Sequence, residues 1–228
     1  PNKQSVTGTP LLLPTFDMAF YPQKRGPYNY TTTGLLPDGS LTNPQSRWGG
    51  MFRKLEQNDF QALNVEYIEF WVMDPFLGNP NSTGGDLYFN LGSISEDILR
   101  DGSKSVENAL PASGDTSQVS YTNWGAVGKN QPVTQAFDND PNARQRQDVG
   151  LDGLNSTDEQ TFFQSYLNQL RGVLPAGSPA LQQAESDPSN DDFVYFRGPQ
   201  LDAANALILQ RYSKFNGTES NSKTAQQA

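Results

Sequence analysis

The sequence contains no histidine and no cysteine. Their absence excludes a Ser-His-Asp or Cys-His nucleophile, a histidine general base, a disulfide, and a zinc site built from Cys or His ligands. Any catalysis would therefore have to use Asp, Glu, Lys, Arg, Ser or Tyr side chains.

Basic residues are also few. The 16 Lys and Arg residues stand against 25 Asp and Glu residues, which gives a formal net charge of −9. An acidic chain without a run of Lys or Arg lacks the positive surface that a phosphate backbone requires. We therefore expect no nucleic-acid partner.

Long apolar runs are missing as well. The longest purely apolar run, residues 70–73, is far short of the roughly 20 residues that cross a bilayer as a helix. We therefore expect neither a transmembrane helix nor a signal peptide. The chain starts at Pro1 without an initiator Met and ends in a polar stretch, which leads us to expect a piece of a longer polypeptide.

The residues that are present are typical of a folded, loop-rich β protein. Aromatic residues make up 11% of the chain, too many for a disordered protein, and 20 Gly and 16 Pro supply turns. β-Branched and aromatic residues predict a strand over 64–73. Both of its faces are mostly apolar, so we expect it near the centre of a sheet. Further strands are predicted over 86–91 and 193–196.

Helices are predicted at three places. Two Ser-x-x-Glu capping boxes, at 93–96 and 156–159, mark the starts of a short helix and of a longer one that ends at Arg171. Apolar residues at helical spacing predict a third helix over 201–215.

Together these elements predict a mainly β protein with peripheral helices (α+β), whose β-sandwich or jelly-roll-like core carries two or three short helices. The expected organisation is an irregular lead-in (1–25), a β-sandwich core (26–128), an acidic loop with a capped helix (129–172), a linker (173–192), a short strand and helix packing back on the core (193–217), and a polar tail (218–228).

Residues 148–159 have the spacing of a partial calcium-binding loop. Counted as a twelve-residue loop, they place Asp at positions one and five, Gly at six, Ser at nine and Glu at twelve. Position three is Gly150, which offers no side-chain ligand, and no helix is predicted to enter the loop. The candidate calcium ligands are Asp148, Asp152, Leu154, Ser156 and Glu159.

The same residues also fit a structure without metal. An Asp-Gly turn followed by a capping box explains the glycine, Ser156 and Glu159, and leaves only Asp148 and Asp152 for a metal to explain. Both interpretations stay open. A second acidic cluster, at 187–192, has no following Gly or Glu, so a solvated loop is favoured there.

Two further patterns bear on enzymatic and sugar-binding functions. Glu66 and Glu69 lie on one predicted strand, but their odd separation projects them to opposite faces, so they do not flank one glycosidic bond. We expect no catalytic residues and no small-molecule substrate. Aromatic side chains near the predicted strands are more often core than a sugar-stacking platform; they are Tyr67, Trp71, Tyr88, Phe89 and Trp124.

Several segments are more distinctive than these general patterns: RWGGMFR at 47–53, NVEYIEFWVMDPF at 64–76, GGDLYFNLGSISEDIL at 84–99, QDVGLDGL at 147–154, DPSNDDF at 187–193 and RYSKFNG at 211–217. In these segments the chain resembles the SprA/Sov family, giant outer-membrane translocon proteins of the Bacteroidetes type IX secretion system that are also tied to gliding motility. The resemblance runs from about residue 25 to residue 221.

The resemblance implies a segment of a much longer polypeptide, whose remainder forms a transmembrane β-barrel that passes folded cargo proteins across the outer membrane. This segment would be a soluble, non-catalytic insert in the cell envelope, on the periplasmic or the extracellular side. Its implied partners are the rest of its own polypeptide, other type IX secretion subunits and transiting cargo.

A different class of function also fits the composition. The chain would then be a standalone secreted carbohydrate-binding β-sandwich steadied by calcium, with Trp and Tyr side chains exposed on one flat face. Binding to polysaccharide distinguishes this alternative from the translocon insert.

Overall fold

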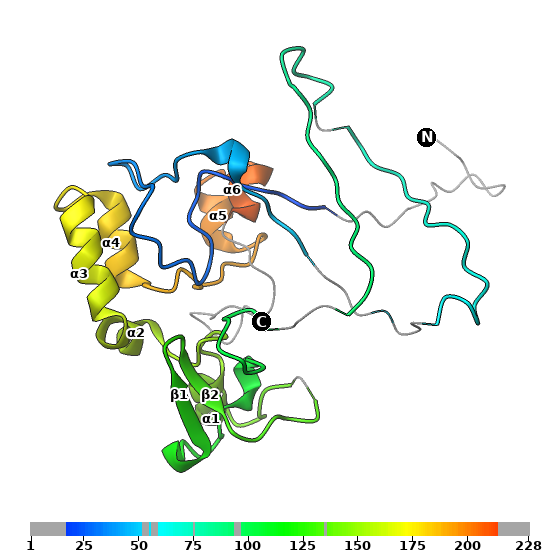
Figure 1. Ribbon diagram of the computed structural model, residues 1–228. Coiled ribbons are helices and arrows are strands. Elements are labelled where there is room, and N and C mark those ends of the chain that lie inside the picture. Colours follow the sequence, from blue (N-terminus) through cyan, green and yellow to red (C-terminus); the bar gives the residue numbers. More distant parts are fainter. Residues whose placement is uncertain are drawn as a thin grey trace. The chain divides into compact units, whose positions relative to one another are not determined.

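A computed structural model describes residues 17–51, 55, 59–74, 76–93, 97–134 and 136–213 (Figure 1). The chain divides into two compact units, one formed by residues 1–49 with 96–228 and the other by residues 50–95. In the part of the chain that the structure describes, no helix is both long and apolar enough to cross a bilayer.

The predicted β-sandwich is wrong. Of the described residues, 27% are helical and 6% are in strands or bridges, and the one sheet found among them has two strands. The helices are α1 (Pro141–Gln147), α2 (Ser156–Phe162), α3 (Gln164–Val173), α4 (Pro179–Ser186), α5 (Pro199–Ala203) and α6 (Ile208–Tyr212), with 3₁₀ turns η1 (Pro44–Ser46), η2 (Glu107–Ala109) and η3 (Thr116–Gln118).

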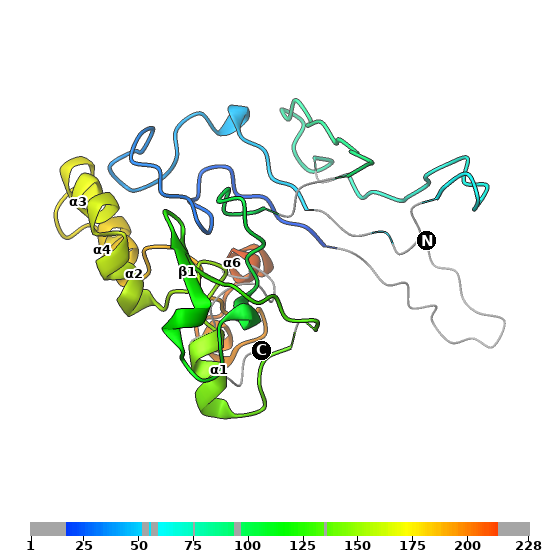
Figure 2. The ribbon, with the colours of Figure 1, turned by 60° about the horizontal axis from the view of Figure 1, so that its bottom comes forward.

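The helices α2, α3 and α4 contact one another (Figures 1 and 2) and supply most of the hydrophobic core of the larger unit. The helix predicted from residue 156 is present, but it is divided at Phe163 into α2 and α3. Phe163, Tyr166, Leu167 and Leu170 recur at helical spacing and are buried together.

The helix α4 completes this core within the stretch that was predicted as a linker. Its start has ordinary helix signals, because Ser178 caps it by accepting a hydrogen bond from the Leu181 amide and Pro179 follows at the first helical position. Leu181 and Ala184 pack against α3. The Pro, Ala and Gln content that predicted a linker therefore belongs to a packed helix.

Tyr30 joins the N-terminal segment of this unit to the helical core. Its ring stacks on Phe163 with centroids 4.3 Å apart, meets Tyr166 edge-on at 5.4 Å and lies 5.9 Å from the ring of Trp124. Aromatic pairs in this distance range contribute stability beyond their buried area.

The hairpin pairs β1 (Val119–Thr122) with β2 (Gly125–Gly128) in antiparallel register, from Val119 opposite Gly128 to Thr122 opposite Gly125. The backbone of β2 lies directly against the acidic loop. The Ala126 amide donates to the Asp152 carbonyl at 2.7 Å, and a Cβ at Gly125 would stand only 2.1 Å from that same oxygen. A glycine is therefore required at this close approach.

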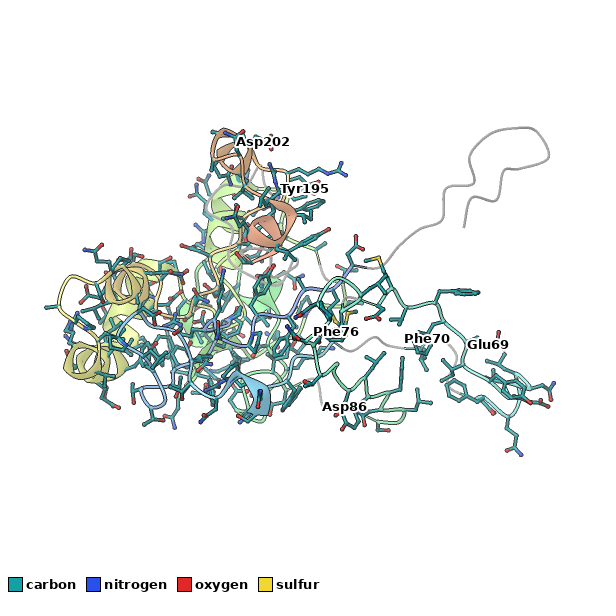
Figure 3. All side chains as sticks on the ribbon, turned by 90° about the horizontal axis from the view of Figure 1, so that it is seen from above. Glu69, Phe70, Phe76, Asp86, Tyr195 and Asp202 are labelled. Carbon is teal, nitrogen blue, oxygen red and sulfur yellow. The ribbon has the colours of Figure 1, made fainter. Side chains whose placement is uncertain are left out.

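The strands predicted over 64–73 and 86–91 are not formed. Both segments lie in the smaller unit, where residues 65–74 and 83–91 adopt neither helix nor strand. They approach each other at Phe70 and Phe89, whose ring centroids are 4.8 Å apart. Figure 3 shows Glu69 and Phe70 on one of these segments and Asp86 on the other. Strand-forming side chains alone do not make a sheet, because each strand needs a hydrogen-bonding partner.

The C-terminal elements are shorter than predicted. Phe193 forms only an isolated bridge in place of the strand over 193–196. Two short helices, α5 and α6, replace the helix over 201–215, and they are separated at Asn205, whose φ of 49° is left-handed. Arg211 holds the pair together through an ion pair with Asp202 at 2.8 Å. Of the predicted short helix over 93–100, residues 97–100 are non-helical and 94–96 lie outside the described residues.

Truncation of Leu170 tests this core. The side chain is almost fully buried among α2, α3 and α4, so we expect Leu170→Ala to lower the free energy of unfolding by about 2–5 kcal/mol. The exposed Leu209 provides a matched control. Leu209→Ala should change the free energy of unfolding by less than about 0.5 kcal/mol. If urea unfolding showed equal decreases in the free energy of unfolding for the two variants, the described core would be contradicted.

Candidate metal centre

Three carboxylates converge inside the larger unit. Asp152 lies in the loop after α1, Glu159 in the first turn of α2 and Asp191 in the loop after α4. All three residues are 0% exposed. One oxygen from each lies within 4.8 Å of the others. Burying three carboxylates this close together is costly unless protons or cations neutralise them.

Asp152 is fixed by the turn that contains it. One carboxylate oxygen, Oδ1, accepts a hydrogen bond from the Leu154 amide at 3.0 Å, and Oδ2 accepts one from the Ser189 hydroxyl. Because its carbonyl is also held by β2, the position of this side chain is set by both its own loop and the hairpin.

Glu159 does not serve the capping box that the sequence predicted. The N-cap of α2 is Asn155, whose side chain accepts hydrogen bonds from the Thr157 and Asp158 amides at 3.0 Å each. The Glu159 side chain points inward, where Oε2 accepts a hydrogen bond from the Ser189 amide at 2.8 Å. Its Oε1 is buried and has no hydrogen-bond partner.

Asp191 is held by its backbone rather than by its carboxylate. Its amide donates to Asp187 Oδ1 at 3.1 Å. Neither carboxylate oxygen has a hydrogen bond of good geometry, although the nearby Tyr28 hydroxyl lowers the pKa of this group. The Asp191 side chain therefore presents two buried oxygens to the cluster.

Ser189 forms hydrogen bonds with several of the groups around the cluster. It is fully buried, and its amide and hydroxyl bond to Glu159 and Asp152 as described above. Its carbonyl accepts a hydrogen bond from the Tyr28 amide at 2.7 Å, and its hydroxyl also lies 2.9 Å from the Tyr30 hydroxyl. The loop after α4 is thereby joined to three other parts of the unit.

The nearest described cation does not pair with the three carboxylates. The Arg25 guanidinium donates to the carbonyls of Asp187 and Pro188 at 3.2 and 3.0 Å, and to the Tyr166 hydroxyl. Within the described ranges, no Lys or Arg forms an ion pair with any member of the cluster. Negative charge at the cluster is therefore not balanced by a basic side chain.

The electrostatic result is a set of raised pKa values. Burial raises the pKa of Glu159 to about 8, with the Asp152 charge adding to the effect. Burial also raises the pKa of Asp152 and of Asp191, and the charges of neighbouring carboxylates increase both shifts. The pKa of Asp187 is raised by burial and by Asp192.

Two of the five predicted calcium ligands belong to this cluster, Asp152 and Glu159. Asp148 ends α1 instead, where its carboxylate lies 3.7 Å from the Arg144 guanidinium. Ser156 is a half-buried residue at the start of α2, and the Leu154 side chain packs in the hydrophobic core.

The cluster at 187–192, predicted as a solvated loop, is buried instead. Asp187, Asp191 and Asp192 are 4%, 0% and 7% exposed. The oxygen-bearing side chains of this segment stand at alternate positions, but no spacing rule connects residue 191 to residue 152. The packing of α4 on α3 and the hydrogen bonds of Ser189 bring the two acidic segments together.

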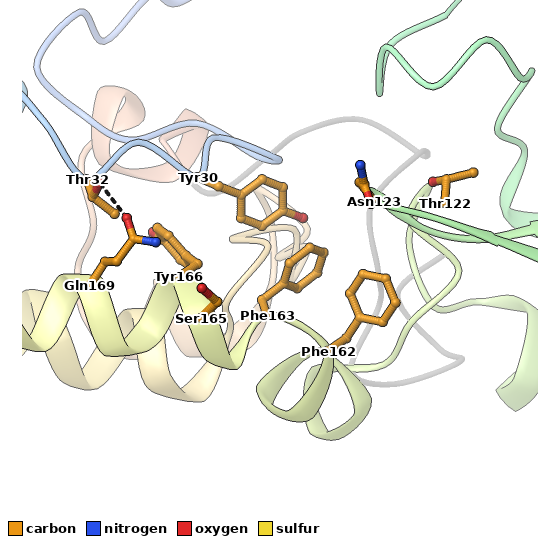
Figure 4. A pocket seen from close by; sticks show the side chains of 9 residues that line it. All are labelled: Tyr30, Thr32, Thr122, Asn123, Phe162, Phe163, Ser165, Tyr166 and Gln169. Carbon is orange, nitrogen blue, oxygen red and sulfur yellow. Dashed lines mark hydrogen bonds between the residues drawn. The ribbon is translucent and has the colours of Figure 1, made fainter.

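Two other places were candidates for a functional site: the pair Glu66 and Glu69, and a pocket beside α3. Glu66 and Glu69 are exposed. A pocket of about 400 Å³ beside α3, seen in Figure 4, contains no Asp, Glu, Lys or Arg side chain; it is lined by Tyr30, Thr32, Thr122, Asn123, Phe162, Phe163, Ser165, Tyr166 and Gln169. The titratable side chains in this lining are Tyr30 and Tyr166, and burial raises the pKa of both hydroxyl groups.

The raised pKa values predict a pH dependence for the chain in a chelator. Glu159 binds its proton more tightly in the folded state than in the unfolded state, so its contribution to stability is complete below pH 4.5 and is lost as the pH rises to about 8. The pKa values of Asp152 and Asp191 are raised as well, so their contributions to stability change with pH in the same direction. At Asp187 the positive charge of Arg25 offsets only part of the rise in pKa.

We therefore expect the free energy of unfolding to fall by about 1 kcal/mol per pH unit between pH 5.5 and 8. Urea unfolding at several pH values measures this slope. Glu159→Gln should flatten the slope, whereas a slope unchanged by that substitution would contradict the assignment of the effect to this cluster.

Comparison with known proteins identifies one part of the chain. Residues 165–228 match the family model SprA_N, described as a motility related/secretion protein. This match confirms the family resemblance and indicates a role in secretion or motility. No curated protein and no solved structure matches the chain.

Proposed function

From the SprA_N motility related/secretion domain that the chain carries at residues 165–228, we propose that the protein is a non-catalytic insert of the type IX secretion translocon. It acts in protein export across the outer membrane and in gliding motility. The proposed location is the cell envelope, at the outer membrane. The proposed partners are the remainder of its own polypeptide, other secretion subunits and transiting cargo.

The observation that carries this proposal is the apolar surface of the smaller unit. Large hydrophobic side chains along two segments are exposed, and Trp71 is 100% exposed. The others are Val65, Tyr67, Ile68, Phe70, Val72, Met73, Leu87, Tyr88, Phe89 and Leu91. Contiguous exposed apolar surface of this kind marks an interaction site rather than a finished monomer surface.

The backbone of the same segments also lacks partners. Among the described residues, 66–74 and 83–93 form no backbone–backbone hydrogen bond. An extended, β-branched and aromatic segment with unpaired N–H and C=O groups readily adds to the edge of another sheet. We infer that strands of the same larger polypeptide supply the missing hydrogen bonds and cover both apolar faces.

A non-catalytic role agrees with the chemistry of the described residues. The buried carboxylates are enclosed rather than open to a cleft, and the pocket of Figure 4 is lined by no Asp, Glu, Lys or Arg side chain. The carbohydrate-binding alternative required a β-sandwich with a flat aromatic face, and the structure does not have that fold.

Fractionation of source cells tests the assignment to a larger translocon. An antibody raised against this chain should detect, in the outer-membrane fraction, a band many times larger than the 25.1 kDa of the chain. A soluble or secreted band near 25 kDa would contradict the proposal.

A pair of substitutions tests the proposed interaction surface. In the chromosomal gene, Trp71→Glu should reduce cargo secretion and colony spreading several-fold, because it places a charge in the apolar surface. Val133 is also fully exposed but lies in the other unit, so Val133→Glu is the control and should leave both activities unchanged. Equal behaviour of the two variants, at equal protein levels, would contradict a role for the smaller unit in assembly.

A further inference from the structure

The acidic loop and Asp191 fit together at the position where the loop lacks a ligand. Gly150 is the third residue of the twelve-residue count and has a left-handed φ of 78°. A Cβ built on Gly150 would stand 2.0 Å from Asp191 Oδ2. The space that a side chain at position three would fill is therefore taken by a carboxylate from the loop after α4.

Several oxygens of this cluster lack a protein hydrogen bond of good geometry. Glu159 Oε1 and both carboxylate oxygens of Asp191 are buried without a hydrogen bond of good geometry. Buried polar atoms are nearly always satisfied in native proteins. The unpartnered Glu159 Oε1 and the Asp191 carboxylate, which has the Tyr28 hydroxyl beside it, therefore call for a ligand that is not a protein group. Their common position beside Asp152 places that ligand between three separate chain segments.

We propose that the carboxylates of Asp152, Glu159 and Asp191 bind one calcium ion. Asp152 and Glu159 correspond to positions five and twelve of the calcium loop, and Asp191 replaces the missing ligand at position three. The ligand set thus differs from the one expected from sequence, which had Asp148, Leu154 and Ser156 in place of Asp191.

The distances and the ligand chemistry agree with calcium. Calcium–oxygen bonds are about 2.3–2.6 Å long, so two oxygens on one ion lie at most about 5 Å apart. The three carboxylates offer oxygens within 4.8 Å of one another. A purely oxygen-based set, in a chain without His or Cys, selects hard cations over zinc or copper.

The bound ion would join segments that are distant in sequence. Asp152 and Glu159 precede the SprA_N match, whereas Asp191 lies inside it. Calcium would therefore join the family-matched residues to the loop that contacts β2 and to the start of α2. This inference does not depend on the proposed role in secretion.

Thermal unfolding of the 228-residue chain tests the proposal. After treatment with a chelator, calcium at about 100 times its Kd should raise the melting temperature by about 5–10 °C. Glu159→Gln and Asp191→Asn remove charge with little change in size, so these variants should fold in chelator as well as the parent chain does and gain less than about 2 °C from calcium. Asp158→Asn, one residue away on the exposed side of α2, is the control and should keep the full shift.

Terbium luminescence provides a second measurement that does not depend on stability. Tyr30 lies beside Ser189, close enough to transfer excitation energy to terbium at the site. Terbium emission should appear with the parent chain, be displaced by calcium and be lost in Asp191→Asn. No calcium shift in the parent chain, or an equal shift in Glu159→Gln, would overturn the proposal. Equal stabilisation by magnesium at the same concentration would overturn the assignment to calcium.

Discussion

The arrangement of the larger unit depends on the buried convergence of Asp152, Glu159 and Asp191 on Ser189. Each residue belongs to a different segment, and Ser189 donates hydrogen bonds to two of the three carboxylates. Like charges at this separation repel in a medium that screens poorly. The unit can therefore adopt this packing only when protons or a cation neutralise the cluster, and the proposed calcium ion satisfies the orphaned oxygens at the same time.

The two units of the chain present opposite physical situations. In the larger unit, apolar side chains from α2, α3 and α4 find partners within the chain, and the acidic cluster fastens the loops around them. In the smaller unit, residues 65–74 and 83–91 expose apolar side chains and unpaired backbone. A chain that combines a packed unit with unpaired, strand-forming segments suits a part of a larger secretion assembly, which is the function proposed.

The sequence patterns correctly predicted those features that interactions between residues close in sequence determine. Helical spacing located the helices α2 and α3, and loop spacing selected Asp152 and Glu159. Asp191 could not be assigned to the cluster from sequence, because its approach to Gly150 follows from the packing of α4. The predicted strand over 64–73 failed for a related reason: its residues favour extended structure, but among the described residues no other segment forms the hydrogen bonds that would pair with it. Composition misled the prediction at α4, where Ser178 gave a valid cap signal within a Pro- and Gln-rich stretch.

Amide hydrogen exchange, compared in calcium and in chelator at neutral pH, tests the central claim most directly. If calcium joins the three segments, it should slow exchange together at the amides of Leu154, Ser189 and Asp191, which lie in two separate loops, while residues 66–74 exchange rapidly in both conditions. Identical exchange at these three amides with and without calcium would contradict the account.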